Sequence, residues 1–193
     1  VDNDTCAIFR AGTTKHWGVG IVAGAGINAV GIGPDGRIVR FLAIGEITGD
    51  NGGGGDLSRR VMWHAIRDED GRGEATLLRQ AVIEHFGMAS VEDVAIAMHV
   101  GEIGNHDLYG LTHVLFDVAA RADPIAVSLV DAQAREVALL AKSTMYRLDL
   151  TETKTDVVLG GGVLTSRDPL LLRRIEHWMR KEAPQAAVRI NDV

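Results

Sequence analysis

The chain has 193 residues and a mass of 20.7 kDa, enough for one ordinary domain with a substantial apolar core. Hydrophobic residues make up 46% and charged residues 24%, and 20 Lys and Arg against 26 Asp and Glu give a net charge of −6, which argues against a general nucleic-acid binder. A single cysteine, Cys6, excludes a disulfide framework within the chain, and the apolar runs are too short to cross a bilayer.

The first part of the chain predicts an antiparallel meander of three strands. Residues 17–23 alternate and are rich in β-branched side chains, and residues 28–32 follow a Gly-Ala-Gly link. Residues 37–42 follow a Pro-Asp-Gly turn. The glycine-rich stretch at residues 43–56 predicts a loop, because glycine destabilises the interior of helices and strands.

From Leu57 onwards the spacing of apolar residues becomes helical. The predicted helices start at Leu57, span residues 75–86, start at Ser90, and span residues 107–121 and 124–147. A short strand at 156–159, a helix at 167–181 and a strand at 186–190 complete the chain. This order predicts an α/β fold with a mixed sheet, in which the three-strand meander is flanked by helices.

A glycine-rich turn, Gly24-Ala-Gly-Ile-Asn28, joins the first two predicted strands. Such a turn can present successive backbone N–H groups on a concave surface, which suits an anion such as phosphate. Glycine also lets the backbone approach a ligand without interference from a Cβ atom. An ordinary hairpin turn is the alternative interpretation.

A second glycine cluster, Gly160, Gly161 and Gly162, lies between a predicted strand and a predicted helix. It is either a tight turn or a surface of bare backbone against which an adenine ring or a ribose can lie. The sequence has no G-x-G-x-x-G fingerprint after a strand and no Walker A lysine motif, which excludes the common dinucleotide and P-loop sites.

Two aspartates are candidates for chemistry. Asp4 lies near the start of the chain, and Asp50 lies in the glycine-rich stretch. A carboxylate can act as the general base for an alcohol that attacks phosphorus. A carboxylate on a glycine-rich loop can accept hydrogen bonds from sugar hydroxyls or help to hold hydrated Mg²⁺. An aspartate of this kind, taken alone, is more often a helix cap or a turn residue, and only the combination of the two favours a role in chemistry.

Taken together, these segments resemble the BadF/BadG/BcrA/BcrD ATPase family and, within it, the N-acetylglucosamine kinases. Residues 1–5 are similar to the connect-1 segment, and residues 24–28 to the phosphate-2 loop. Residues 49–57 are similar to the family's Gly-Asp-Glu-Gly-Ser-Gly segment, residues 117–124 to a helix end with a nucleotide contact, and residues 157–163 to the adenosine motif. The resemblance implies an RNase H-like (actin-like ATPase) fold.

The resemblance also implies an activity, the ATP-dependent transfer of a phosphoryl group to a hydroxyl of an N-acetylglucosamine-like sugar, with ATP and Mg²⁺ as cofactors. It makes Asp4 the catalytic base. The implied nucleotide-binding residues are Gly24, Ala25, Gly26, Ala119, Gly160, Gly161 and Gly162. The implied sugar-binding residues are Asn28, Gly45 and Asp50. No metal ligands are assigned, because glycines interrupt any helix that would align His99, His106 and His113.

By the same resemblance, residues 1–193 form a single C-terminal domain of a two-domain parent. Its parts are a connecting segment at 1–16, the meander with the phosphate-2 loop at 17–56, a helical part at 57–147 and the adenosine motif at 155–193. A phosphate-1 loop like Asp-Gly-Gly-Gly-Thr-Lys-Thr is absent, as is the connect-2 helix, so we expect the chain alone to be inactive. We expect a cytoplasmic protein that binds sugar and ATP but no nucleic acid or membrane, with a homodimer left open.

Some residues depart from the family pattern. Ala25 and Ile27 replace the usual hydroxyl residues of the phosphate-2 loop, and Ile44 stands where the kinases have a tryptophan. An ATP-dependent activator or regulator without sugar kinase activity is therefore an alternative. The dehydratase activators of the family share an iron–sulfur cluster between subunits, a role that the single Cys6 fits poorly. A fold retained only for assembly is a third alternative.

Overall fold

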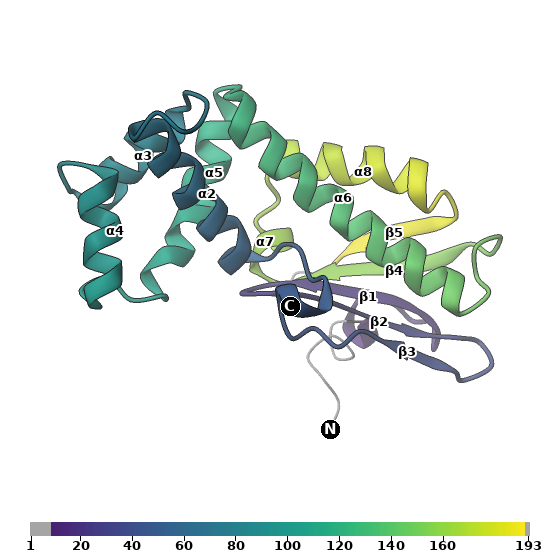
Figure 1. Ribbon diagram of the computed structural model, residues 1–193. Coiled ribbons are helices and arrows are strands. Elements are labelled where there is room, and N and C mark those ends of the chain that lie inside the picture. Colours follow the sequence, from purple (N-terminus) through teal and green to yellow (C-terminus); the bar gives the residue numbers. More distant parts are fainter. Residues whose placement is uncertain (1–8, 192–193) are drawn as a thin grey trace. The chain divides into compact units, whose positions relative to one another are not determined.

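The computed structural model describes residues 9–191, and the chain divides into two compact units (Figure 1). The first, here the sheet unit, comprises Val1–Gly53 and Asp131–Val193, and the second, here the helical unit, comprises Gly54–Val130. Helix α6 (Pro124–Arg147) contributes residues to both. Asp4 lies outside the described residues.

The sheet unit contains a five-stranded mixed sheet of order β3-β2-β1-β4-β5. Its strands are β1 (Gly18–Ala23), β2 (Ile27–Ile32), β3 (Ile38–Arg40), β4 (Thr155–Gly160) and β5 (Ala186–Ile190). The first three form the predicted antiparallel meander, while β4 pairs in parallel with β1 and with β5. The predicted mixed sheet is therefore confirmed, with β1 joining its antiparallel and parallel halves.

Helices α6 and α8 (Pro169–Glu182) cover one face of this sheet (Figure 1). A Cβ atom at Gly31 of β2 would lie 2.3 Å from the Thr144 side chain of α6, so glycine in this strand allows the helix to approach closely. Residues 9–12 are helical and lie against the other face, where a Cβ atom at Gly12 would lie 2.2 Å from Val158 of β4. Each face of the sheet therefore packs against at least one helical segment.

A buried carboxylate ties the segment before β1 to the sheet. Asp156 of β4 accepts hydrogen bonds from Thr13 Oγ1 (2.7 Å) and Lys15 Nζ (3.2 Å), and Arg189 Nε lies 3.5 Å away. Burial is the largest single effect on the pKa of Asp156, and by itself it would raise this pKa. The hydrogen bonds from Thr13 and Lys15, together with the charges of Lys15 and Arg189, outweigh burial and lower the pKa of this carboxyl.

We expect Asp156→Ala to lower the free energy of unfolding at neutral pH by about 1–3 kcal/mol, because hydrogen bonds to a charged group are lost. The folded pKa lies below the unfolded value near 3.8, so the stability from Asp156 is present above that value. It is lost as the pH falls through the folded pKa. Urea unfolding at neutral and acidic pH checks this, with Asp117→Ala, at an exposed helical position, as the control. Equal losses in both variants would contradict the prediction.

The helical unit contains α2 (Gly54–Glu69), α3 (Leu77–Phe86), α4 (Val91–Val100), the 3-10 helix η2 (Asp107–Gly110), α5 (Leu111–Ala120) and the start of α6. Buried Asp123 joins α3 to α6, because its carboxylate accepts hydrogen bonds from Thr76 Oγ1 and from the N–H groups of Leu77 and Ala126 (each 2.9 Å). The predicted cap at Ser90 is confirmed, since its hydroxyl accepts from Asp93 N (3.0 Å).

Several helices differ from the predicted ones in their ends or their number. Helix α2 begins at Gly54, ahead of Leu57, because the N–H groups of a first turn make no intrahelical bonds and glycine is tolerated there. The helix predicted at 107–121 is split into η2 and α5 at Gly110. The short helix α7 (Gly162–Thr165) precedes α8, whose first turn is capped by Asp168 through Leu171 N (2.8 Å).

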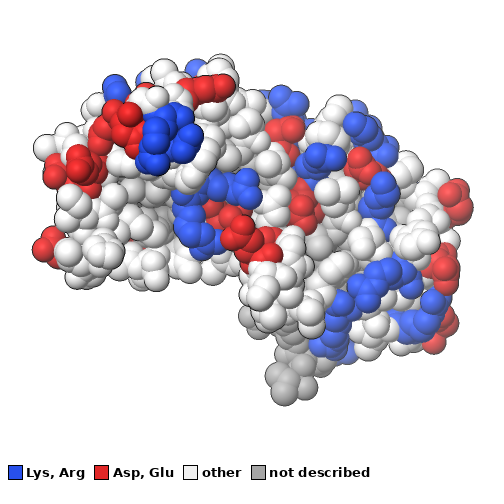
Figure 2. All heavy atoms as spheres, viewed as in Figure 1, with Lys and Arg blue, Asp and Glu red and all other residues white. Residues whose placement is uncertain are grey.

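The apolar character of the helices and the distribution of surface charge both bear on the class of protein. No helix within residues 9–191 combines the length and the apolar character needed to cross a membrane. On the face drawn in Figure 2, basic and acidic side chains are interspersed over both units. This face therefore presents no extended basic track of the kind that follows a nucleic-acid backbone.

Candidate functional site

The two glycine-rich turns predicted from the sequence lie at the same end of neighbouring strands in the sheet unit. Strands β1 and β4 are parallel, with Val22 opposite Gly160, so the turns that follow them meet. A Cβ atom at Gly161 would lie 2.6 Å from the carbonyl oxygen of Ala23, and the φ of Gly161 is +87°. Only glycine fits this contact. The carboxyl ends of parallel strands are where α/β proteins commonly bind ligands.

Three glycines of these turns are required neither by packing nor by backbone conformation. A Cβ atom at Gly24, Gly26 or Gly162 would meet no atom of the chain's described part within 4 Å, and none has the positive φ that favours glycine. Side chains would fit there without a ligand. Bare backbone facing open space is what close approach of a phosphate or a nucleoside requires.

The hydrogen bonds within the turn at residues 24–26 show which of its backbone N–H groups are free to bind an anion. Gly24 N donates to Gly26 O (2.9 Å) and closes the turn. The N–H groups of Ala25 and Gly26 make no hydrogen bond to other described residues, and both residues are exposed. These two N–H groups are therefore the ones free to bind a ligand, whereas the N–H of Gly24 shapes the turn.

A residue that sequence reasoning missed holds the glycine-rich loop against this turn. Gly53 N donates to Oε1 of buried Gln133 of α6 (2.8 Å). A Cβ atom at Gly53, which has a φ of +81°, would lie 2.4 Å from the backbone of Gly26. The Nε2 group of Gln133 has no hydrogen-bond partner in the described part of the chain. Gln133 thus fixes the loop by one of its two polar atoms.

Directly after the first turn, the sheet unit has a half-open cavity of about 230 Å³, here called the polar cavity after its polar side chains. Its polar lining comes from β2, the loop after β3 and α6, namely from Asn28, Thr48, Asp50, Glu136 and Ser143. Its apolar lining is Ile27, Phe41, Leu139 and Leu140. This volume is smaller than the roughly 300–1,000 Å³ of pockets for drug-sized ligands, so the cavity suits a smaller molecule with both polar and apolar faces.

Asp50 shapes the loop that borders this cavity. Its Oδ2 accepts hydrogen bonds from Gly45 N (2.7 Å) and Thr48 Oγ1 (3.0 Å), which closes the loop around the 3-10 helix η1 (Glu46–Thr48). Asn28 Oδ1 accepts from Ala29 N (2.7 Å), which leaves the side-chain amide N–H groups of Asn28 as donors. The cavity therefore offers an acceptor on Asp50 and a donor on Asn28, as a sugar hydroxyl requires.

Glu136 is the second carboxylate of the cavity, and nothing in its sequence surroundings indicated it. Burial raises the pKa of its carboxyl, the charge of Asp50 raises it further, and Arg135 opposes both. Glu136 makes no hydrogen bond or ion pair with another described residue. The cavity thus holds two carboxylates, and the charge of Asp50 disfavours ionisation of Glu136.

The remaining predicted site residues are Asp4, Ala119 and Gly45. Asp4 precedes the described residues, and a base at that position stays a prediction. Ala119 is buried on α5 in the helical unit, so the nucleotide contact there also stays a prediction. Gly45 contributes its N–H to the Asp50 loop. Among residues 9–191, no group of three or more His, Cys, Asp or Glu is arranged to hold a metal ion.

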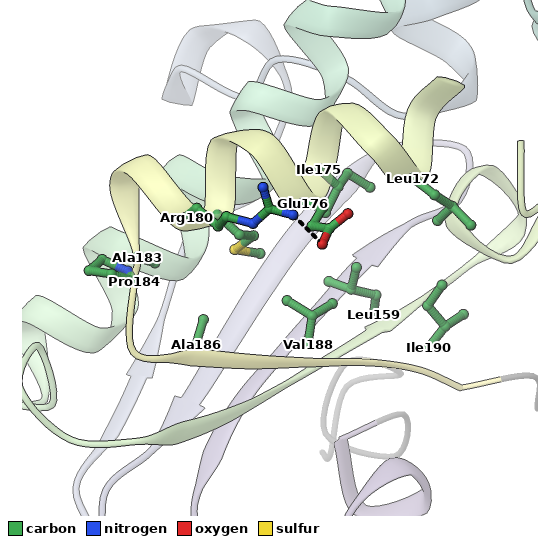
Figure 3. Close-up of a pocket in the computed structure, with 11 residues that line it drawn as sticks. Leu159, Leu172, Ile175, Glu176, Arg180, Ala183, Pro184, Ala186, Val188 and Ile190 are labelled. Carbon is green, nitrogen blue, oxygen red and sulfur yellow. Dashed lines mark hydrogen bonds and ion pairs between the residues drawn. The ribbon is translucent and has the colours of Figure 1, made fainter. Parts of the chain in front are cut away.

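A larger cavity of about 450 Å³ lies between α8 and β5 (Figure 3). Its lining is mainly aliphatic and includes Leu159, Ile175 and Val188. Its charged side chains, Glu176 and Arg180, pair with each other on α8. Because Glu176 and Arg180 satisfy each other and the rest of the lining is mainly aliphatic, we assign this cavity no catalytic role.

This fold is that of the actin-like ATPases, and similar solved structures are sugar kinases of that class. A candidate N-acetylglucosamine kinase of Chromobacterium violaceum has a TM-score of 0.73 at 21% identity, over 96% of this chain and 60% of the other. A ROK family glucokinase of Streptomyces griseus, solved with glucose and AMPPNP, has a TM-score of 0.56 at 19% identity, over 98% and 62%. The predicted α/β, RNase H-like (actin-like ATPase) fold is confirmed.

The chain belongs to the BadF/BadG/BcrA/BcrD ATPase family, whose model matches residues 1–191. It is 26% identical to the N-acetylmuramic acid/N-acetylglucosamine kinase of Clostridium acetobutylicum over 86% of this chain and 54% of that protein. It is 28% identical to the N-acetyl-D-glucosamine kinase of Dictyostelium discoideum over 84% and 52%. The resemblance noted in the sequence is thereby confirmed. The chain spans about half the length of the curated relatives it matches.

Proposed function

We propose that this chain forms the nucleotide- and sugar-binding part of an ATP-dependent kinase for N-acetylglucosamine-like hexosamines. The observation that carries the proposal is that the glycine-rich turn between β1 and β2 and the polar cavity adjoin each other in the chain. The bare turn at residues 24–26 leads directly into Ile27 and Asn28, which line the polar cavity with Asp50. A phosphate on the turn and a sugar in the cavity would therefore be neighbours. The curated relatives named as sugar kinases support the same activity.

In this proposal each group has one task. The N–H groups of Ala25 and Gly26 bind phosphate oxygens, and residues 160–162 receive the adenosine. Asn28 and Asp50 orient the sugar, and Asp4 accepts the proton of the attacking hydroxyl. ATP supplies the phosphoryl group and Mg²⁺ spreads its charge, so the protein contributes mainly positioning and electrostatic stabilisation.

The proposal includes a second domain. Residues 1–193 contain no phosphate-1 loop pattern, and catalysis of this kind needs phosphate contacts from both sides. Closure of the two domains would exclude water and suppress hydrolysis of ATP. We therefore expect the 193 residues alone to bind ligands without transferring phosphate.

The test is phosphorylation of a panel of hexosamines by the full-length protein with MgATP. We expect N-acetylglucosamine or a close analogue to be phosphorylated. Asp50→Asn should raise KM for the sugar by about 10- to 100-fold, because hydrogen bonds to a charged group contribute about 1.5–3 kcal/mol. The KM for ATP should stay unchanged. A panel in which no sugar is phosphorylated would refute the proposal.

One observation favours the alternative of an ATP-dependent regulator. Ile44, at the position of the kinases' tryptophan, is 67% exposed and does not line the polar cavity. A regulator would hydrolyse ATP, or bind it without turnover, irrespective of the sugar offered. The same panel, with ADP release measured alongside sugar phosphate, distinguishes the two functions.

A further inference from the structure

Helix α6 places a second carboxylate in the cavity that we assign to the sugar. Glu136 and Asp50 come from distant parts of the sequence, yet both line this one cavity of about 230 Å³. Asp50 is engaged by Gly45 and Thr48 through Oδ2, as the structure of its loop requires. Glu136 makes no hydrogen bond or ion pair with the rest of the described chain, so its role is not to hold the fold together.

The charges that face Glu136 are few. Asp50 faces it from the loop after β3, and Arg135 is its neighbour on α6. The guanidinium of Arg135 lies over the ring of Trp178 on α8, 5.2 Å from the ring centre, and forms no ion pair with Glu136. The other lining residues, from β2, the loop and α6, are uncharged. The cavity therefore carries negative charge without a cation among its lining residues.

This arrangement discriminates between ligands by their charge. The hydroxyl groups of an uncharged sugar can donate hydrogen bonds to both carboxylates. A sugar that bears its own carboxylate would bring a third negative charge into a half-buried site, where like charges repel more strongly than in water. A cavity with this charge would oppose an acidic sugar, whatever its affinity for the neutral one.

We propose that Glu136 is a specificity-determining residue that selects uncharged sugars against sugars bearing a carboxylate. The proposal rests on the assignment of a sugar kinase activity and extends it to the substrate's charge. The repulsion depends on ionised Glu136, because a neutral glutamine of the same shape leaves only Asp50 to oppose the acidic ligand. Discrimination should therefore fall when Glu136 is neutralised, either by substitution or by protonation.

The experiment uses the full-length protein and two pairs of sugars that differ mainly in charge. The first pair is N-acetylglucosaminuronic acid and its amide, with the acidic group on C6. The second is N-acetylmuramic acid and its methyl ester, with the acidic group on the C3 substituent. Each is measured as a competitive inhibitor of N-acetylglucosamine phosphorylation, and the ratio of inhibition constants within a pair reports discrimination by charge alone.

For the wild-type protein, we expect the acid of at least one pair to have a higher inhibition constant than its neutral partner, so that the ratio of acid to neutral compound exceeds one. Glu136→Gln should reduce that ratio by about tenfold, the effect of removing one like charge at short range. Glu152→Gln, which makes the same charge change at an exposed position outside this cavity, should leave the ratio unchanged. Because burial and the charge of Asp50 raise the pKa of Glu136, a lower pH should reduce the ratio in the wild type more than in Glu136→Gln.

The outcomes separate this inference from the proposed function. Ratios that are unchanged by Glu136→Gln in both pairs, or that are equal to one in the wild type, overturn the role of Glu136 while the kinase activity stands. Failure of all four compounds to inhibit also overturns it. If the wild-type protein phosphorylates no sugar, the proposed function fails and the role of Glu136 fails with it.

Discussion

Asp4→Asn in the full-length protein is expected to reduce kcat for sugar phosphorylation by about 10²- to 10⁴-fold, the usual contribution of a general base. Asparagine has the shape of aspartate but cannot accept the proton that the attacking hydroxyl must lose. Binding of ATP should stay within about twofold of the wild type, because the proposed nucleotide contacts come from backbone groups of two glycine turns. A coupled assay for ADP and a fluorescent nucleotide titration measure the two quantities.

The neighbouring residue Asp2 provides a matched control for Asp4. Asp2→Asn makes the same change in charge two positions earlier, and we expect it to keep most of the activity. An Asp4→Asn protein that phosphorylates sugar at the wild-type rate would remove the assignment of the base. Loss of ATP binding in Asp4→Asn would show that the substitution acts on the nucleotide site or on folding instead.

Local patterns were sufficient to predict the meander of the sheet unit. The β-branched residues of β1 and the turns around Gly24–Ala25 and Pro34–Asp35 are features of neighbouring residues, and the register of β1 with β2 follows from them. The parallel pairing of β4 with β1 could be expected only from the order of elements. Helix ends were less predictable. The glycines at the start of α2 belong to a glycine-rich stretch that predicts a loop, and only the structure shows that they form the first turn of the helix.

The candidate site was predictable where it consists of backbone. Glycines at residues 24–26 and 160–162 mark the turns in the sequence itself, whereas side-chain partners become visible only in three dimensions. Gln133 and Glu136 lie one turn apart on α6 and look like ordinary polar positions of a long helix. Their roles depend on the loop that reaches them, Gly53 for Gln133 and Asp50 for Glu136. No spacing within the sequence contains that information.

Gly26→Val should weaken ATP binding by about 10- to 100-fold and leave the free energy of unfolding within about 0.5 kcal/mol of the wild type. The added side chain meets no atom of the described chain within 4 Å, so the fold tolerates it. It would occupy the space from which a phosphate reaches the N–H groups of Ala25 and Gly26. Nucleotide titration and thermal unfolding of the full-length protein check both parts. Gly104→Val, at a loop position of ordinary φ and contacts, controls for the added bulk.

Gly53→Ala should give the opposite pattern, a loss of stability caused by packing and backbone conformation. Its Cβ atom would lie 2.4 Å from the backbone of Gly26, and its φ of +81° disfavours any other residue. We expect a loss of at least about 2 kcal/mol of stability, because a left-handed conformation alone costs roughly 1–2 kcal/mol and the contact adds to it. If Gly26→Val destabilised the protein as much as Gly53→Ala does, the first turn would be a packing element, and its bare backbone would no longer indicate a ligand. A stable Gly26→Val protein with intact ATP affinity would place the phosphates elsewhere.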